Sequence, residues 1–216
     1  MKILRPTLLA VCVAMVSGHA LAYQADDVIA RFGPAVVAPD GDSSSALGDI
    51  ADVDDGYSAG ISATYMINDL FGLEVLGALP FKHDIHGSGA LDGVEIGSTW
   101  QLPPTLLLQF APPVSESFQP YVGLGYNYTF FFDEKTDGEL DTALGAPTSL
   151  SLSDSSGIAY EVGVDVPIRD RWMFNASVWH IDIDTTADVK AAGSTAAKVD
   201  VTIDPWVYMV GLGVKF

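Results

Sequence analysis

The chain has 216 residues, with 28 acidic and 10 basic side chains, and therefore a formal net charge of −18 at neutral pH. Such a charge repels nucleic acid and anionic membrane surfaces, which excludes both as partners. Hydrophobic residues nevertheless make up 49% of the sequence. This combination is easier to explain if the apolar side chains face lipid and the acidic ones lie in loops outside it.

Residues 1–22 have the pattern of a secretory signal peptide. A basic start precedes a short apolar run and the small-residue cleavage site Ala-Leu-Ala at 20–22, which predicts export and a mature chain that begins at Tyr23. Cys12 lies in the removed segment, so the mature chain contains no disulfide framework. The alternative, a lipoprotein modified at Cys12, is disfavoured because Val11 is a poor residue in front of a lipidated cysteine.

The mature chain is predicted to be all-β. No stretch in it approaches about 20 consecutive apolar residues, which excludes a spanning helix and leaves a closed β-barrel as the structure able to satisfy its backbone inside lipid. Runs of about 10 alternating residues recur along it, with one bulky apolar face and one small or neutral face. They predict an eight-stranded antiparallel transmembrane β-barrel over residues 23–216, with strands at 25–38, 56–67, 71–83, 98–111, 119–133, 153–167, 171–185 and 198–216.

The predicted connections alternate in length. The segments 68–70, 112–118 and 168–170 are short and belong on the periplasmic side, as in other such barrels. The longer segments are predicted to be outer loops: 40–55, 83–97, 134–152 and 191–196. Acidic residues concentrate in the first of these loops, where they could bind divalent cations that bridge lipopolysaccharide. No stretch has the spacing of a calcium-binding loop, so a solvated, repulsive loop is the favoured interpretation; its acids are Asp40, Asp42, Asp49, Asp52, Asp54 and Asp55.

Five blocks of the sequence resemble the OmpW family: LGALPFKHDI, LPPTLLLQF, FQPYVGLGYNYTFFFDE, NASVWHIDIDTTA and DPWVYMVGLGVKF. The resemblance covers nearly the whole mature chain in matching order, and it is least in the first and third outer loops. It implies an eight-stranded barrel in the bacterial outer membrane that lets small hydrophobic molecules enter passively, as AlkL-type importers of the family do. Phe216, at the end of the last strand, also resembles the signal read by the outer-membrane assembly machinery.

The inward-facing residues change character along the barrel. Eight strands enclose an interior just wide enough for side chains or one small ligand. Near the periplasmic floor the inward residues are polar and of both charges, which predicts a paired polar plug: Arg31, Glu74, Gln109, Glu161, Asp165, Asn175 and Lys215. Farther out they are apolar, which predicts a ligand pocket or, alternatively, a filled core: Leu76, Leu107, Phe131, Trp179, Ile181, Ile183, Val207 and Met209.

Pro103 and Pro104 interrupt a predicted membrane-spanning strand. Proline has no backbone N–H to donate, so pairing with a neighbouring strand should be weakened at the height of the apolar pocket. We therefore expect a side opening there, through which a solute passes into the outer leaflet. The alternative is a local bulge without a role in transport.

The other signals point away from catalysis. His83 and His86 are predicted to lie in an exposed loop, and the chain has no nucleophile elbow, zinc-protease motif or nucleotide-binding loop. The sequence therefore predicts a monomer without catalytic residues, metal or cofactor, whose partners are outer-membrane lipid, lipopolysaccharide and small hydrophobic solutes. The competing hypothesis is a structural or receptor barrel with an inert interior, whose loops contact surface polymers, phage or bacteriocins.

Overall fold

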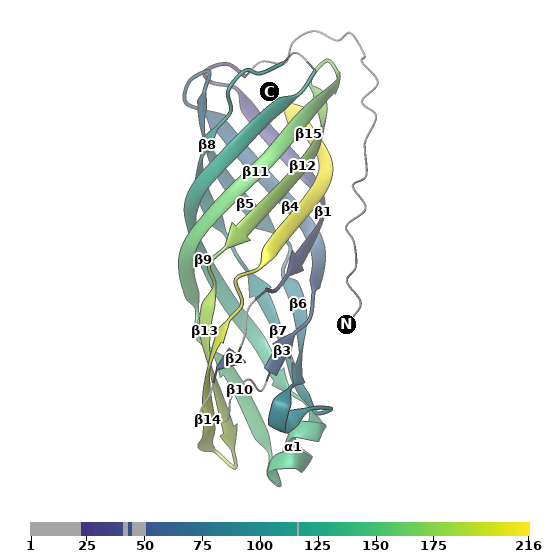
Figure 1. The fold of residues 1–216 in the computed structure, drawn as a ribbon, viewed down its shortest axis with the longest axis vertical. Helices are drawn as coiled ribbons and strands as arrows, with labels where there is room; N and C mark the ends of the chain where they lie inside the picture. The colour runs from purple at the N-terminus through teal and green to yellow at the C-terminus, as the bar shows by residue number, and fades with distance from the viewer. Residues whose placement is uncertain (1–22, 41–42, 45–50, 116) are drawn as a thin grey trace, which may run out of the picture.

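The computed structural model describes residues 23–40, 43–44, 51–115 and 117–216. The predicted signal peptide and two of the first-loop acids, Asp42 and Asp49, lie outside the described residues. Strands dominate the described part of the chain, and they wind around one elongated barrel (Figure 1).

Among the described residues, eight antiparallel strands close into a barrel, which confirms the predicted fold class. Closure comes from the pairing of the last strand with the first and of β9 with β11. The membrane-spanning segments are β1 (Val28–Ala38), β4 (Gly56–Met66), β5 (Phe71–Ala78), β8 (Thr105–Phe110), β9 (Gln119–Thr136), β11 (Ser155–Arg169), β12 (Trp172–Ile181) and β15 (Trp206–Lys215).

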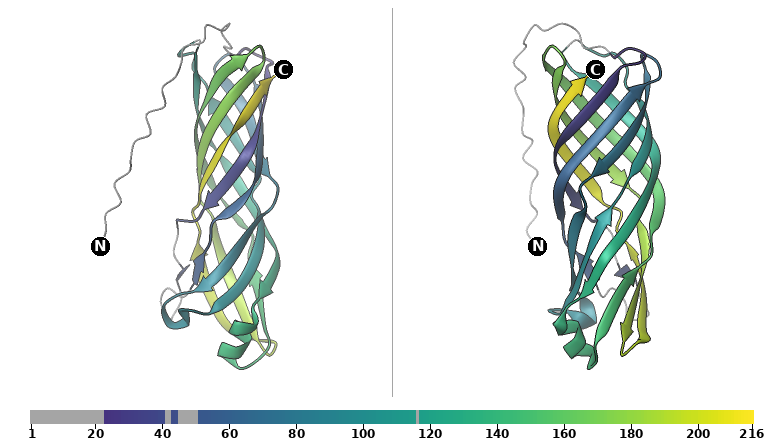
Figure 2. Two further views of the ribbon diagram at one scale, coloured as in Figure 1. Left: turned by 90° about the vertical axis from the view of Figure 1, so that its right-hand side faces the viewer. Right: turned by 180° about the vertical axis from the view of Figure 1, so that it is seen from behind.

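The barrel continues well beyond these segments on the side of the long connections, where the sequence predicted loops. Short strands pair there, α1 caps the far end, and Figure 2 shows this extension from two further sides. Its inner residues pack on one another in a separate apolar cluster, which is why these segments are ordered into strands. The elements are β2 (Ser43–Ser44), β3 (Ala51–Val53), β6 (Phe81–Gly87), the 3-10 turn η1 (Gly89–Leu91), β7 (Glu95–Leu102), α1 (Gly138–Leu144), β10 (Thr148–Leu152), β13 (Asp184–Ala191) and β14 (Ser194–Thr202).

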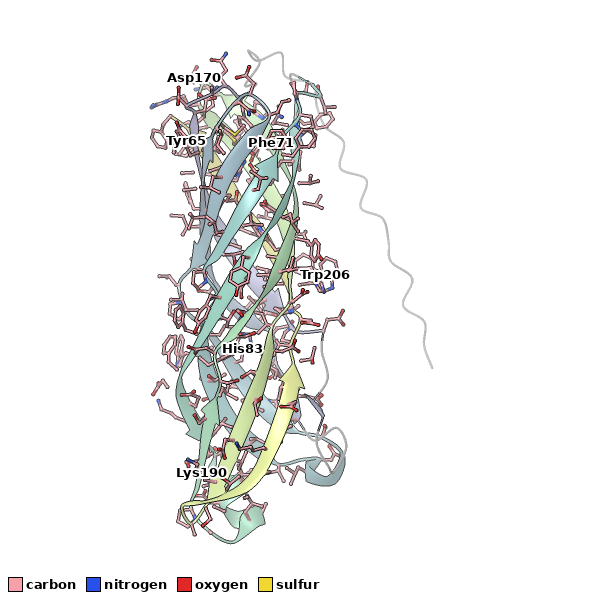
Figure 3. The ribbon with its side chains drawn as sticks, turned by 90° about the vertical axis from the view of Figure 1, so that its left-hand side faces the viewer. Tyr65, Phe71, His83, Asp170, Lys190 and Trp206 are labelled. Atoms are coloured by element: carbon pink, nitrogen blue, oxygen red, sulfur yellow. The ribbon has the colours of Figure 1, made fainter. Side chains whose placement is uncertain are left out.

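Side chains alternate between the interior and the lipid-facing surface. Figure 3 shows Tyr65 and Phe71 near the end with the short turns, and Trp206 farther along the barrel, as expected for two aromatic girdles. Tyr208 and Val210 of β15 are exposed on the lipid-facing surface, whereas Val214 is only 8% exposed, in register between Ala30 and Trp172. None of the helices in the described part of the chain is long and apolar enough to cross a membrane.

Candidate solute-binding site

A layer of charged and polar side chains fills the barrel near the short turns. Arg31 lies at its centre, fully buried, and its guanidinium donates to Glu74 Oε2 at 3.0 Å and to Asp165 Oδ2 at 2.8 Å. The Tyr121 ring covers the same guanidinium, with its centroid 4.4 Å from Cζ. A buried charge is costly unless it is paired and hydrogen-bonded, and these contacts meet both conditions.

Amide and hydroxyl groups connect the remaining carboxylates of this layer. Gln109 Nε2 donates to Glu74 at 2.9 Å and to Glu161 at 3.2 Å, while Asn175 Nδ2 donates to Asp165 at 2.9 Å. Sequence reasoning missed Thr64, Tyr23 and Tyr121, which are uncharged but also bind within the layer. Lys215, which had been assigned to the plug, instead lies near the end of the barrel, where it pairs with Asp27 at 3.1 Å.

A small apolar cavity of about 20 Å³ lies in the middle of the barrel. Of the predicted pathway residues, it brings together Leu76, Trp179, Ile181, Val207 and Met209. Leu107 is fully buried in the same apolar cluster but does not line this cavity, and Phe131 lines a different one.

The sheet has a gap directly beside this cavity. The ladder between β5 and β8 ends at the pair Leu76 and Thr105, and the ladder between β6 and β7 starts at Phe81 and Gln101, so residues 77–80 and 102–104 have no partner across this seam. Pro103 is buried and lines the cavity.

The other edge of the proline strand is held by β9. The backbone N–H of Tyr128 donates to the Pro104 carbonyl at 3.1 Å, so pairing continues there across the proline pair. The break is therefore one-sided. Gly77 borders it in the lipid-facing row opposite Ile61, and a Cβ added to Gly77 would meet no atom within 4 Å.

A larger apolar cavity, of about 210 Å³, lies in the outer extension of the barrel. For comparison, a dry cavity of about 150 Å³ is large enough to bind benzene. Sequence reasoning missed this cavity because about half of its walls come from segments predicted to be loops, although Phe131, a predicted pathway residue, also lines it. The available signal of a strand with an inward apolar face was a short alternating run such as the one that contains Leu150 and Leu152. The other residues in the walls of the cavity include Ala51, Ile85, Leu91, Ile96, Leu140, Ala187 and Val199.

The prediction that His83 lies in an exposed loop is wrong. The alternation of β6 continues past Phe81, so His83 faces inward and is 1% exposed, while its neighbours Lys82 and Asp84 face outward and form an ion pair of 2.6 Å. Those outward charges also place this part of β6 outside the hydrocarbon region. His86 also lies in β6 and not in a loop; its side chain is 45% exposed, and Nε2 lies 3.1 Å from Asp54 Oδ2.

Burial sets the protonation of His83. Removal from water lowers the pKa of its imidazole below the ordinary value, against the opposing effects of a hydrogen bond with the Asp54 backbone and of the carboxylates of Asp55, Asp84 and Asp54. His83 is therefore neutral at physiological pH. Within the described residues, no group of three or more histidine, cysteine, aspartate or glutamate side chains could hold a metal ion.

Comparisons with known proteins agree on one family. The profile described as "OmpW family" matches residues 24–216. "Outer membrane protein W" of Vibrio cholerae is 42% identical over 214 residues, which cover 96% of this chain and 97% of that protein. The crystal structure of the outer membrane protein OprG from Pseudomonas aeruginosa is 43% identical and superposes with a TM-score of 0.81, covering 94% of this chain and 99% of that one.

A more distant solved structure shares the fold alone. It is the solid-state NMR structure of the outer membrane protein AlkL in lipid bilayers, 20% identical, with a TM-score of 0.66 over 95% of this chain and 97% of that one. These proteins are described as outer-membrane proteins.

Proposed function

The chain belongs to the OmpW family of outer-membrane β-barrels, and from its two apolar cavities we propose that it takes up small hydrophobic molecules passively. The outer cavity would receive the solute from outside the cell. The observation that carries the proposal is the stacking of this cavity on an apolar layer above a charged plug. Such an interior suits a small apolar guest and gives it no apolar route through the floor.

The route onward is proposed to run sideways. The apolar layer between the cavities contains Phe81, Phe131 and Trp179, and the small cavity beneath it borders the gap in the sheet at Pro103. A solute that reaches this gap exchanges one apolar environment for another when it moves into the outer leaflet. Descent through the plug would instead require breaking the buried ion pairs of Arg31.

A charged residue in the apolar layer tests the pathway. Trp179 is fully buried beside the small cavity, and Trp179→Lys should abolish uptake of an apolar solute because a lysine there would have to be solvated or paired inside the barrel. Unchanged uptake by a correctly assembled variant would instead favour the receptor or structural barrel with an inert interior.

Covering the gap tests the lateral exit separately. Gly77→Trp places a bulky side chain on the lipid side of the gap, where the added Cβ has free space. Uptake should fall while guest binding in the outer cavity stays unchanged. Ile61→Trp is the matched control, because Ile61 occupies the same lipid-facing row against an intact ladder. Equal uptake by the two variants would rule out this exit.

A further inference from the structure

The outer cavity is apolar except for a small polar region on one wall. His83 and Gln101 both line it, and each is 1% exposed. Within the described part of the chain, neither His83 Nε2 nor Gln101 Nε2 has a hydrogen-bond partner. A buried polar atom left unpaired costs about 1–3 kcal/mol, so two such atoms in the wall of a cavity indicate a place for a polar group of the guest.

These two side chains are close neighbours on the inner face of the sheet. The register between β6 and β7 sets His83 opposite Thr99 and Phe81 opposite Gln101. His83 and Gln101 are therefore diagonal neighbours, a relation that separates the positions by roughly 7–8 Å and leaves long side chains within reach of one functional group. On its other side Gln101 pairs with Phe131, so aromatic rings flank the amide.

The hydrogen-bonding role of each nitrogen follows from its surroundings. His83 Nδ1 lies 2.8 Å from the backbone carbonyl oxygen of Asp54, which can only accept, so Nδ1 carries the hydrogen. In the neutral ring Nε2 is then an acceptor, and the His83 side chain lines the cavity. The Gln101 amide nitrogen is a donor. The wall of the cavity thus contains one unpaired acceptor and one unpaired donor on neighbouring residues.

Gly56 leaves the space that the imidazole needs. A Cβ at this position would lie 2.6 Å from His83 Cε1 and 2.9 Å from Nε2, so any larger residue would displace the ring. The orientation of His83 is therefore fixed from two directions, by the Asp54 carbonyl on one side and by the bare backbone of Gly56 on the other.

We propose that the outer cavity binds apolar molecules that carry one hydroxyl-type group, such as an alcohol, a phenol or an undissociated carboxylic acid. The O–H donates to His83 Nε2, and the oxygen accepts from Gln101 Nε2. The hydrocarbon part lies against Phe131, Ile85 and Leu150. A hydrocarbon satisfies neither nitrogen, and an aldehyde or ketone satisfies only Gln101. This inference rests on the proposed uptake function, because it names the solutes that the same cavity prefers.

The test compares three probes of similar size: para-xylene, para-tolualdehyde and para-cresol. The full barrel is placed in lipid nanodiscs with ¹⁵N-labelled histidine and ¹³C-labelled leucine and isoleucine methyl groups. Shifts of the Leu150 and Ile85 methyl signals report occupancy of the cavity, and the ¹⁵N signal of His83 Nε2 reports the hydrogen bond. We expect all three probes to shift the methyl signals and only para-cresol to move the Nε2 signal.

A substitution then measures the contribution of the donor. In Gln101→Leu the ratio of the para-cresol affinity to the para-xylene affinity should fall by about tenfold, the loss expected for one hydrogen bond at the strong end of the usual range. Taking the ratio cancels the different solubilities of the probes in water and lipid. His86→Gln is the control, because His86 is exposed on the same strand and should leave the ratio unchanged.

Each result bears on a definite claim. If para-xylene occupies the cavity but para-cresol leaves the Nε2 signal unmoved in the wild-type barrel, the hydroxyl preference is wrong and the uptake function stands. If no probe shifts the methyl signals, both the preference and the proposed solute site are wrong. The wild-type spectrum decides between these outcomes even if Gln101→Leu does not fold.

Discussion

Replacing Arg31 by methionine should cost the barrel a large part of its stability. Arg31 is fully buried and pairs with Glu74 and Asp165, which are also buried. Removing one partner of a buried ion pair typically costs about 3–5 kcal/mol, because it leaves an uncompensated charge in a low-dielectric interior. Here two carboxylates lose their partner at once, so we expect Arg31→Met to lower the free energy of unfolding by at least that amount, against a total of roughly 5–15 kcal/mol for ordinary domains.

Reversible urea unfolding in lipid vesicles, followed by tryptophan fluorescence, measures this loss. The triple variant Arg31→Met, Glu74→Gln, Asp165→Asn should recover most of it, because the two carboxylates that pair with Arg31 are then neutral as well. Lys135→Met is the control, since Lys135 pairs with Asp133 on the exposed surface, where such pairs contribute at most about 1 kcal/mol. A loss below about 1 kcal/mol for Arg31→Met, or no recovery in the triple variant, would refute the account of the plug.

Three further outcomes follow from the geometry of the interior. Gly163→Ala should destabilise the barrel by about 1–3 kcal/mol in the same unfolding assay, because the added Cβ would lie 2.2 Å from the Tyr121 ring that covers Arg31; stability equal to wild type would contradict this. Gly56→Ala should weaken para-cresol binding more than para-xylene binding, and an equal effect on both probes would show that the His83 ring has not been displaced selectively. Finally, para-cresol affinity should stay constant from about pH 8, where the phenol keeps its O–H, down to about 6.5, the ordinary histidine value. It should fall only below that value, because the lowered pKa of His83 keeps Nε2 an acceptor until then; an affinity that already falls between about pH 8 and 6.5 would contradict the assignment.

Protonation of His83 also affects the stability of the folded barrel. In the unfolded chain His83 takes up its proton near the ordinary pKa, whereas in the folded barrel it does so only at lower pH. The contribution of His83 to stability is therefore complete above the ordinary value and is lost as the pH falls below it.

The lipid-facing rows and the plug could be predicted from the sequence because both depend on the positions of residues along single strands. Alternation sets which side chains face inward, and distance from a short turn sets their height, which was sufficient to bring Arg31, Glu74 and Asp165 to one layer. Proline chemistry likewise marked the place where the ladder between β5 and β8 ends.

The outer cavity could not be predicted in the same way. Its walls depend on pairings between segments far apart in the chain, such as β10 with β13, and those runs are too short for periodicity alone to distinguish them from loops. His83 was misplaced for the same reason: it reads as part of a polar loop until β7 is known to pair with β6.

The central claim is that the barrel conducts small apolar molecules, and the rate of uptake tests it most directly. A radiolabelled apolar solute is supplied to cells that contain or lack the barrel, matched for outer-membrane integrity and for the amount of total outer-membrane protein. We expect faster uptake in cells with the wild-type barrel, and no acceleration in cells with Trp179→Lys. Equal uptake rates with and without the wild-type barrel, across several apolar solutes, would contradict the claim.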